Sequence, residues 1–287
     1  MKVANKWKDY QIIATGDGYK LEDWKGVKLL RPDPQVIWKT DVDMDNYPTL
    51  NAKYERSEKG GGKWNVKKRY PDEWTINYGE LKFLIKPMGF KHTGLFPEQA
   101  VNWDIMTDLI KKANRPINVL NLFAYTGGAT VALLKAGASV CHVDASKGMV
   151  ERAGENCRLS NVGEGKVRFI IDDCLKFVQR EIRRGKKYDA ILMDPPSYGR
   201  GPNGEMWKIE NEIYNLVQTC KQVLSDNPLF FLINSYTTGL QPQVINNIIT
   251  LALKDFGGQV ESYEVGLPTN EGIILPCGCS GLWKNDK

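Results

Sequence analysis

From about residue 96 onward, short apolar segments alternate with amphipathic ones, and this alternation restricts the chain to few folds. Continuous apolar strands that alternate with helices predict a parallel sheet covered by helices on both faces. The predicted strands are Asn118–Phe123, Ser139–Asp144, Val167–Asp172, Ala190–Asp194 and Leu229–Asn234. Helices are expected over Pro97–Ala113 and near 128–137, 146–161, 174–185, 207–225 and 242–256. Two final strands, Gln259–Val265 and Ile273–Pro276, have no helix between them and predict an antiparallel hairpin that closes the sheet.

Residues 1 to about 90 lack long helical periodicity and predict a small antiparallel β module. Short β-rich runs alternate with turn signals, and Gly60–Gly62 predicts a hinge or a loop tip. The runs are Tyr10–Thr15, Val27–Leu30, Gln35–Trp38 and a hairpin of Trp74–Tyr78 with Leu81–Lys86. We therefore expect a β-rich module over 1–90 and an α/β domain over 91–287.

The net charge of +5 is concentrated in residues 53–91, which hold ten Lys or Arg and five Asp or Glu. In this segment Lys53, Arg56, Lys59, Lys63, Lys67, Lys68 and Arg69 are interleaved with Tyr54, Trp64, Tyr70 and Trp74. Basic and aromatic side chains together are typical of surfaces that bind phosphates and stack bases. A solvated hairpin whose aromatic rings face the core is the alternative.

The composition is that of a globular protein without a membrane span. The first residues lack the apolar segment of a signal peptide, and no apolar run approaches the roughly 20 residues of a transmembrane helix. The cytoplasm is therefore the expected location, where cysteines are reduced. Only Cys277 and Cys279 lie close together in the sequence, and His92 and His142 stand apart from them, so we predict no metal site.

The segment Tyr188–Tyr198 carries the clearest chemical signal. A buried strand must end at Asp194-Pro195-Pro196, because two successive prolines cannot donate to a sheet. The stiff backbone beyond it presents a carboxylate, free carbonyls and the ring of Tyr198, which together suit a nucleobase. An ordinary exit from a strand into a loop is the alternative.

Other strand ends also carry polar groups, and in open α/β sheets ligands bind at the carboxyl ends of the strands. Gly127-Gly128 opens a helix, where free N–H groups are available, but it is no Gly-x-Gly-x-x-Gly array for a pyrophosphate. Asp144 suits ribose hydroxyls, or it is a solvated residue before a helix that Ser146 caps. Asp173 with the Cys174 backbone could bind an adenine edge, or Asp173 is simply a helix N-cap.

These features describe an adenosine site beside an Asp-Pro-Pro loop, which fits S-adenosyl-L-methionine. Residues 90–284 resemble class I S-adenosylmethionine-dependent methyltransferases, and most of all the bacterial ribosomal-RNA large-subunit branch. The resemblance is carried by Asn121-Leu-Phe-Ala-Tyr-Thr-Gly127, Asp194-Pro-Pro196 and Phe90–Gln99. It implies a Rossmann-like, seven-stranded sheet that is mostly parallel, with an antiparallel C-terminal hairpin.

The resemblance also implies roles for individual residues. Phe123, Tyr125, Thr126 and Gly127 would line the methionine part of the cofactor, Asp144 would hold the ribose and Asp173 the adenine. Asp194, Pro195, Pro196 and Tyr198 would face the methyl acceptor. The remaining residues expected at the cofactor are Phe96, Gln99, Asn121, Ala145, Ser146 and Cys174.

One departure from the resemblance bears on the reaction. Cytosine-C5 methyltransferases of this branch carry a nucleophilic cysteine after the fifth strand, whereas the matching stretch here, Asn234–Leu240, has none. A covalent mechanism then requires Cys277 or Cys279 to fold back, whereas methylation of a base nitrogen needs no such nucleophile. The loop Gly199–Glu205 is expected to cover the acceptor, with Arg200 on a phosphate or at the free surface.

The leading hypothesis is a methyltransferase that modifies a base nitrogen of RNA, and the resemblance implies that this RNA is ribosomal. A methyltransferase of a protein or a small molecule is the second hypothesis. A non-catalytic RNA-binding protein with this fold is the third, and the missing glycine array disfavours a nicotinamide oxidoreductase.

Overall fold

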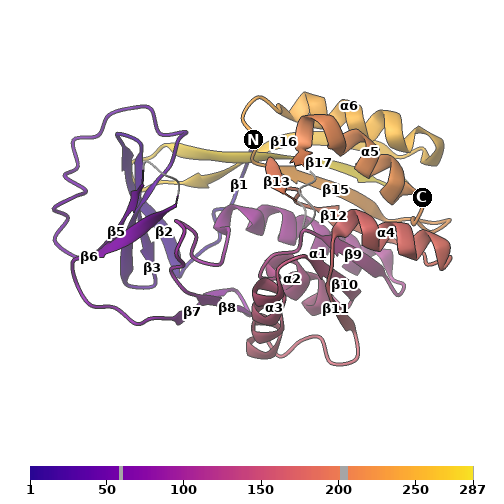
Figure 1. Ribbon diagram of the computed structural model, residues 1–287, viewed down its shortest axis with the longest axis horizontal. Coiled ribbons are helices and arrows are strands. Elements are labelled where there is room, and N and C mark those ends of the chain that lie inside the picture. Colours follow the sequence, from indigo (N-terminus) through magenta and orange to yellow (C-terminus); the bar gives the residue numbers. More distant parts are fainter. Residues whose placement is uncertain (58–60, 201–205, 287) are drawn as a thin grey trace. The chain divides into compact units, whose positions relative to one another are not determined.

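The computed structural model describes residues 1–57, 61–200 and 206–286. The chain divides into two compact units. The larger unit contains Met1, residues 102–265 and residues 278–287, and the N-terminal unit contains residues 2–101 together with residues 266–277. Figure 1 shows the elements of both units along the chain.

A mostly parallel sheet, most of whose residues belong to the larger unit, forms the centre of that unit. Its strand order is β1-β16-β17-β15-β12-β9-β10-β11. Neighbouring strands from β11 to β15 are parallel, whereas β17 runs antiparallel to β15. This sheet confirms the α/β fold predicted from the sequence. The strands are β1 (Lys2–Val3), β9 (Asn118–Leu122), β10 (Ser139–Asp144), β11 (Val167–Ile171), β12 (Ala190–Met193), β15 (Phe230–Ser235), β16 (Gln259–Pro268) and β17 (Ile274–Lys284).

Helices cover both faces of this sheet (Figure 1). They are α1 (Ala100–Ala113), preceded by a 3-10 turn at Pro97–Gln99, and α2 (Gly128–Lys135), α3 (Lys147–Leu159), α4 (Cys174–Arg183), α5 (Ile209–Lys221) and α6 (Pro242–Leu253), followed by a 3-10 turn at Lys254–Phe256. Phe177, Leu216 and Ile249 from the last three helices form one buried cluster with Ile191 and Phe231 of the strands. Burial of such side chains stabilises the fold by about 2 kcal/mol each.

The strand order places a switch point between β9 and β12. From β9 the chain proceeds outward to β10 and β11, and it then returns to β12 on the other side of β9. Consecutive connections therefore diverge at the carboxyl ends of these two strands. A crevice outside this point is where open α/β sheets bind ligands.

The N-terminal unit is a separate β structure with its own small core, in which Leu21, Leu30 and Leu50 are buried. A five-stranded sheet has the order β2-β3-β4-β5-β6, and β7 pairs with β8 as the predicted hairpin. The prediction of a purely antiparallel module is wrong, because β5 runs parallel to β4. The strands are β2 (Tyr10–Gly16), β3 (Tyr19–Trp24), β4 (Val27–Pro32), β5 (Leu50–Arg56), β6 (Gly62–Val66), β7 (Trp74–Tyr78) and β8 (Leu81–Ile85). Part of the predicted hinge, Gly60, lies outside the described residues.

One predicted strand of this unit is wrong. Residues 35–38 form a turn and irregular backbone, because the Asp33 side chain accepts a hydrogen bond from Gln35 N at 3.1 Å and its carbonyl accepts one from Val36 N at 3.2 Å. The apolar pattern has another explanation: Val36 is buried as an isolated residue, whereas Ile37 is 89% exposed.

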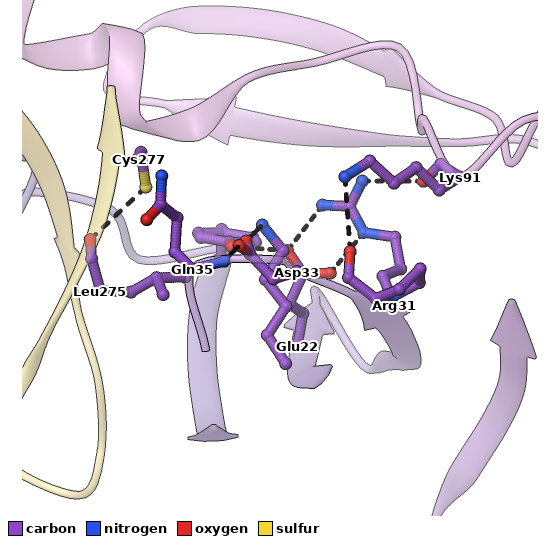
Figure 2. Close-up of polar contacts among 10 residues, drawn as sticks. Glu22, Arg31, Asp33, Gln35, Lys91, Leu275 and Cys277 are labelled. Atoms are coloured by element: carbon purple, nitrogen blue, oxygen red, sulfur yellow. Dashed lines mark hydrogen bonds and ion pairs between the residues drawn. The ribbon is translucent and has the colours of Figure 1, made fainter. Parts of the chain in front are cut away.

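A buried ion pair lies in the core of the N-terminal unit (Figure 2). The Arg31 guanidinium donates to both oxygens of Glu22, at 2.6 and 2.7 Å, and Tyr10 Oη donates to Glu22 at 2.7 Å. Burial alone would raise the pKa of Glu22, but the charges of Arg31 and Lys20 outweigh it and lower that pKa. Glu22 is therefore a buried carboxylate, and each of its oxygens accepts at least one hydrogen bond.

No helix in the described part of the chain is long and apolar enough to cross a membrane. Within residues 1–57, 61–200 and 206–286, no three His, Cys, Asp or Glu side chains come together in a way that could hold a metal ion.

Candidate functional site

The loop after β9 has an unusual backbone that is held by hydrogen bonds to β10 and α4. Phe123, Tyr125 and Gly127 all have positive φ, at 54°, 52° and 78°. Phe123 N donates to Cys174 Sγ at 3.2 Å, and Ala124 N donates to the Val143 carbonyl at 3.1 Å. Non-glycine residues in this conformation cost of order 1 kcal/mol or more, and they cluster at functional sites. The loop is thus held in its shape by β10 and by the first residue of α4.

Gly127 allows the start of α2 to pass close to α3. A Cβ atom at this position would lie 2.8 Å from the Ala153 Cβ and 3.4 Å from the His142 ring. Asn156, also on α3, donates to the Thr126 carbonyl at 2.8 Å. The backbone between β9 and α2 is therefore closely packed against α3.

Asp144 at the end of β10 is half-buried and organises the same loop. Its Oδ2 accepts from Tyr125 N at 2.9 Å, and its Oδ1 accepts from Ser146 N at 2.8 Å. Each carboxylate oxygen can accept two hydrogen bonds. One acceptor position on each oxygen thus remains beyond these two bonds, which suits a pair of vicinal hydroxyl groups.

Asp173 has the helix-capping role, one of the two alternatives that the sequence left open. Its Oδ1 accepts from Lys176 N at 2.9 Å, so it caps α4. The side chain is nevertheless exposed, and Ile171, at the end of β11, is 51% exposed beside it. An exposed aliphatic side chain and an exposed carboxylate, two residues apart in the sequence, suit a purine ring and its amino group.

Asp194 follows β12 directly at the switch point. Its N–H donates to the Leu122 carbonyl of β9 at 3.4 Å, which places it next to the Phe123 loop. The Asp194 Oδ1 atom accepts from Asn234 Nδ2 at 3.2 Å. Pro195 is buried, whereas Pro196 and Tyr198 are exposed. The carboxylate and the tyrosine ring therefore lie at the edge of the sheet where the polar strand ends meet.

A short hairpin extends from the Asp-Pro-Pro segment. It consists of β13 (Tyr198–Arg200) and β14 (Met206–Lys208), which pair antiparallel. Trp207 Nε1 donates to the Pro196 carbonyl at 2.6 Å, and its ring lies 6.0 Å from the Phe123 ring. The hairpin therefore joins the loops after β9 and β12. Residues 201–205 lie outside the described residues, so the predicted cover over the acceptor is not tested.

Ser197 and Thr237 connect the segment after β15 to the segment after β12. Their hydroxyl oxygens are 2.6 Å apart, so the segment after β12 contacts the segment after β15. This pair, like Trp207 and Asn156, was not predictable from the sequence, because a single Ser, Trp or Asn outside a recognisable motif carries no signal for its partner.

The other residues predicted at the cofactor include exposed and buried positions, and two of them belong to the N-terminal unit. Ala145 and Ser146 are exposed after β10, whereas Asn121 is buried and donates to Thr130 Oγ1 at 2.9 Å. Phe96 and Gln99 belong to the N-terminal unit, where the Phe96 ring lies 5.6 Å from His92. Their roles at the cofactor stay predictions.

The basic and aromatic segment folds into β5, β6 and the turn beyond them. Its rings mostly pack within the N-terminal unit: Tyr54 is buried, its ring lies 5.3 Å from that of Trp64, and Trp74 Nε1 donates to the Trp24 carbonyl. Lys53 pairs with Asp45, and Lys67 and Lys68 donate to backbone carbonyls. Lys59 lies outside the described residues. Within this segment, the exposed cations that have no hydrogen-bond or ion-pair partner among the described residues are Arg56, Lys63 and Arg69.

Comparison with known proteins gives consistent results. A family model described as S-adenosylmethionine-dependent methyltransferase matches residues 52–219. The crystal structure of the SAM-dependent methyltransferase from Agrobacterium tumefaciens has a TM-score of 0.90 and 32% identity, over 97% of this chain and 91% of that chain.

Two curated relatives are ribosomal RNA large subunit methyltransferases K/L. The protein of Shewanella frigidimarina is 31% identical over 181 residues, which cover 62% of this chain and 24% of the relative. That of Syntrophotalea carbinolica is 26% identical over 189 residues, which cover 65% of this chain and 26% of the relative. The chain spans about a quarter of the length of these two relatives.

Proposed function

Because this chain belongs to the family of S-adenosylmethionine-dependent methyltransferases, we propose that it transfers the methyl group of S-adenosyl-L-methionine to a nitrogen atom of an RNA base. The observation that carries this proposal is the position of Asp194. This carboxylate lies at the end of β12, joined through Leu122 to the loop after β9, and it is followed by two prolines and an exposed tyrosine.

The polar groups around the switch point fit the cofactor. Asp144 keeps acceptor positions for the two ribose hydroxyls, and the exposed Asp173 and Ile171 suit an adenine ring. The backbone of Phe123–Gly127 would contact the methionine part, where Gly127 leaves room beside the start of α2. When bound, S-adenosylmethionine supplies a methyl group on a sulfonium, which needs no further activation.

In this proposal the protein acts mainly by positioning the acceptor. Asp194 accepts a hydrogen bond from an N–H group of the base, and the Pro195 carbonyl accepts a second. Tyr198 stacks on the flat ring. These contacts direct the nitrogen lone pair in line with the methyl–sulfur bond; the nitrogen–carbon bond forms as the carbon–sulfur bond breaks, and the surplus proton leaves to Asp194 or water. Such orientation supplies much of the rate enhancement in a two-reactant step.

The buried thiols support transfer to nitrogen rather than through a cysteine adduct. Burial raises the pKa of the Cys279 thiol to about 11, and its Sγ donates to the Leu240 carbonyl at 3.2 Å. Burial also raises the pKa of Cys277. A thiol is nucleophilic as its thiolate, so both cysteines are poorly suited to attack a base.

RNA as the acceptor rests on two supports. The curated relatives are named for ribosomal RNA methylation, and the N-terminal unit exposes Arg56, Lys63 and Arg69 without partners in the described residues. A ribosomal RNA acceptor would place the protein in the cytoplasm. A protein or small-molecule acceptor is the competing proposal, and its turnover would depend little on salt, because few phosphates would be neutralised.

The direct test is transfer of labelled methyl from S-adenosylmethionine to total RNA of a strain that lacks this protein. We expect label that nuclease removes and protease does not, and nucleoside analysis that places it on a base nitrogen. Label on carbon C5 would overturn the nitrogen assignment. Label in protein or small molecules alone would overturn the RNA acceptor.

Substitution of Asp194 separates chemistry from cofactor binding. We expect Asp194→Ala and Asp194→Asn to lower methyl transfer at least a hundredfold, while the affinity for S-adenosylmethionine, measured by calorimetry, changes less than threefold. Equal loss of both would show that Asp194 has a structural role instead.

A further inference from the structure

A chain of buried hydrogen bonds leads through the larger unit to Asp194. Tyr263 Oη donates to Asn102 Oδ1 at 2.8 Å, and Asn102 Nδ2 donates to Ser280 Oγ at 3.0 Å. Ser280 Oγ donates to Asn234 Oδ1 at 2.9 Å, and Asn234 Nδ2 donates to Asp194 Oδ1 at 3.2 Å. The chain thus joins α1, β16, β17 and β15 to the end of β12.

The order of donors along this chain is set by its own chemistry. A serine has one hydroxyl proton, and because Ser280 already accepts from Asn102, that proton is directed to Asn234 Oδ1. Asn234 can then present only its NH₂ group to Asp194. The opposite orientation of the Asn234 amide would place an oxygen against the carboxylate, and it would leave the Ser280 proton without an acceptor.

Because these residues are buried, reversing the direction of these hydrogen bonds would cost free energy. Asn102 and Asn234 are each 1% exposed, and Ser280 is fully buried. A buried polar group that loses its partner is costly because no water replaces it. The four residues behind Asp194 therefore hold one arrangement of protons, unlike a surface cluster, in which solvent would permit several.

We propose that Ser280, Asn102 and Tyr263 are positioning residues that orient the Asn234 amide, and that this amide fixes the Asp194 carboxylate toward the methyl acceptor. The inference rests on the proposed function of Asp194. Loss of the amide contact lets the carboxylate rotate, and the acceptor nitrogen loses its alignment.

The test compares substitutions that each remove one hydroxyl or one amide. We expect Ser280→Ala to lower kcat about tenfold and Tyr263→Phe about twofold, with KM for S-adenosylmethionine unchanged. Ser225→Ala is the matched control, since Ser225 Oγ also donates to an aspartate, Asp189, at 3.0 Å, but before β12 rather than after it; its kcat should equal that of the wild type.

Epistasis distinguishes positioning from general structural support. If Ser280 acts through the Asn234 amide, Ser280→Ala in an Asn234→Ala background should lower kcat no further. A further tenfold loss in the double variant would overturn the proposal, as would an unchanged kcat in Ser280→Ala alone. Thermal unfolding of each variant identifies any loss of activity caused by unfolding.

An additional measurement does not depend on activity. In protein labelled with ¹⁵N-asparagine, we expect the Asn234 side-chain NH₂ to be protected from hydrogen exchange and to lose protection at least tenfold in Ser280→Ala. Protected signals in an enzyme that fails to methylate RNA would refute the proposed acceptor and leave the hydrogen-bond chain standing. Unprotected signals in an active enzyme would refute the chain.

Discussion

At the scale of single residues, the strained backbone between β9 and α2 is explained by what surrounds it. Phe123 and Tyr125 adopt positive φ although neither is glycine. Their N–H groups are satisfied by Cys174 Sγ and by the Asp144 carboxylate. These bonds offset the backbone cost, so the loop keeps one shape before any ligand arrives. The sequence identified the loop but could not predict its dihedral angles, because these depend on partners 19 and 51 residues away.

Gly127 allows a sharp test of the close approach of α2 and α3. Gly127→Ala should destabilise the protein by about 2–4 kcal/mol, because it adds a methyl group 2.8 Å from Ala153 Cβ to a residue with a φ of 78°. Gly137→Ala is the control, since Gly137 also has a positive φ but open space around it. Urea unfolding should show a loss of about 1 kcal/mol for Gly137→Ala. Equal losses would mean that the contact with Ala153 is easily relieved.

The lowered pKa of His142 leads us to expect that stability depends on pH. Burial lowers the pKa of His142 to about 4 in the folded protein, whereas an unfolded histidine titrates near 6.5. The unfolded chain therefore binds the proton more readily, so the contribution of His142 is complete above pH ~6.5 and declines as the pH falls toward 4.

We expect the free energy of unfolding to fall by about 2 kcal/mol more between pH 7.5 and pH 5 in the wild type than in His142→Asn. Urea titrations at the two pH values measure this difference, and comparison of the two proteins removes the contributions of other titrating groups. An equal change in the free energy of unfolding in both proteins would show that His142 protonates without unfolding.

At the scale of elements, apolar periodicity predicted the larger unit well because its strands are buried on both faces. The four residues of β12 are all buried, as are the six of β15. The N-terminal unit is less regular, and Val36 is buried in a turn where its pattern suggested a strand. For the candidate site, residues at strand ends were predictable from their neighbours in sequence. Asn102 and Ser280 were not, since they meet only in the folded chain, at a separation of 178 residues.

The position of Trp207 in the hairpin of β13 and β14 leads us to expect that its substitution affects methyl transfer. Trp207→Phe keeps an aromatic ring near Phe123 but removes the hydrogen bond to the Pro196 carbonyl. We expect kcat for methyl transfer to fall three- to tenfold with unchanged affinity for S-adenosylmethionine, because the acceptor segment is less well fixed.

Trp283→Phe is the control for this substitution. It removes a similar bond, from Nε1 to the Gly257 carbonyl at 2.6 Å, at a buried position in β17. It should lower thermal stability and leave kcat unchanged. A similar loss of kcat in both variants would mean that the Trp207 bond has no specific role at the site.

At the scale of the whole molecule, two units with separate cores use different means of stabilisation. The larger unit buries a long apolar cluster, whereas the N-terminal unit also contains the ion pair of Glu22 and Arg31. The removal of one member of a buried ion pair is strongly destabilising, because it leaves the other charge without a partner.

Glu22→Gln should therefore destabilise the protein by about 3–5 kcal/mol in urea unfolding followed by tryptophan fluorescence. Asp17→Asn is the control, because it breaks the exposed pair of Asp17 and Lys39, in which the lysine side chain is 89% exposed. Its cost should stay below about 1 kcal/mol. Comparable costs would contradict the view that Glu22 holds a buried charge.

The division of the chain between the units has a consequence for protein synthesis. Residues 266–277 complete the N-terminal unit, and they are made about 165 residues after residue 101. At a typical 5–20 residues per second, the ribosome needs roughly ten to thirty seconds to reach them. During that interval β9 to β15 can already assemble, while the first part of the chain still lacks residues 266–277. The unit whose synthesis begins first is thus completed only when residues 266–277 have been made, near the end of the chain, and chaperones have that interval in which to bind it.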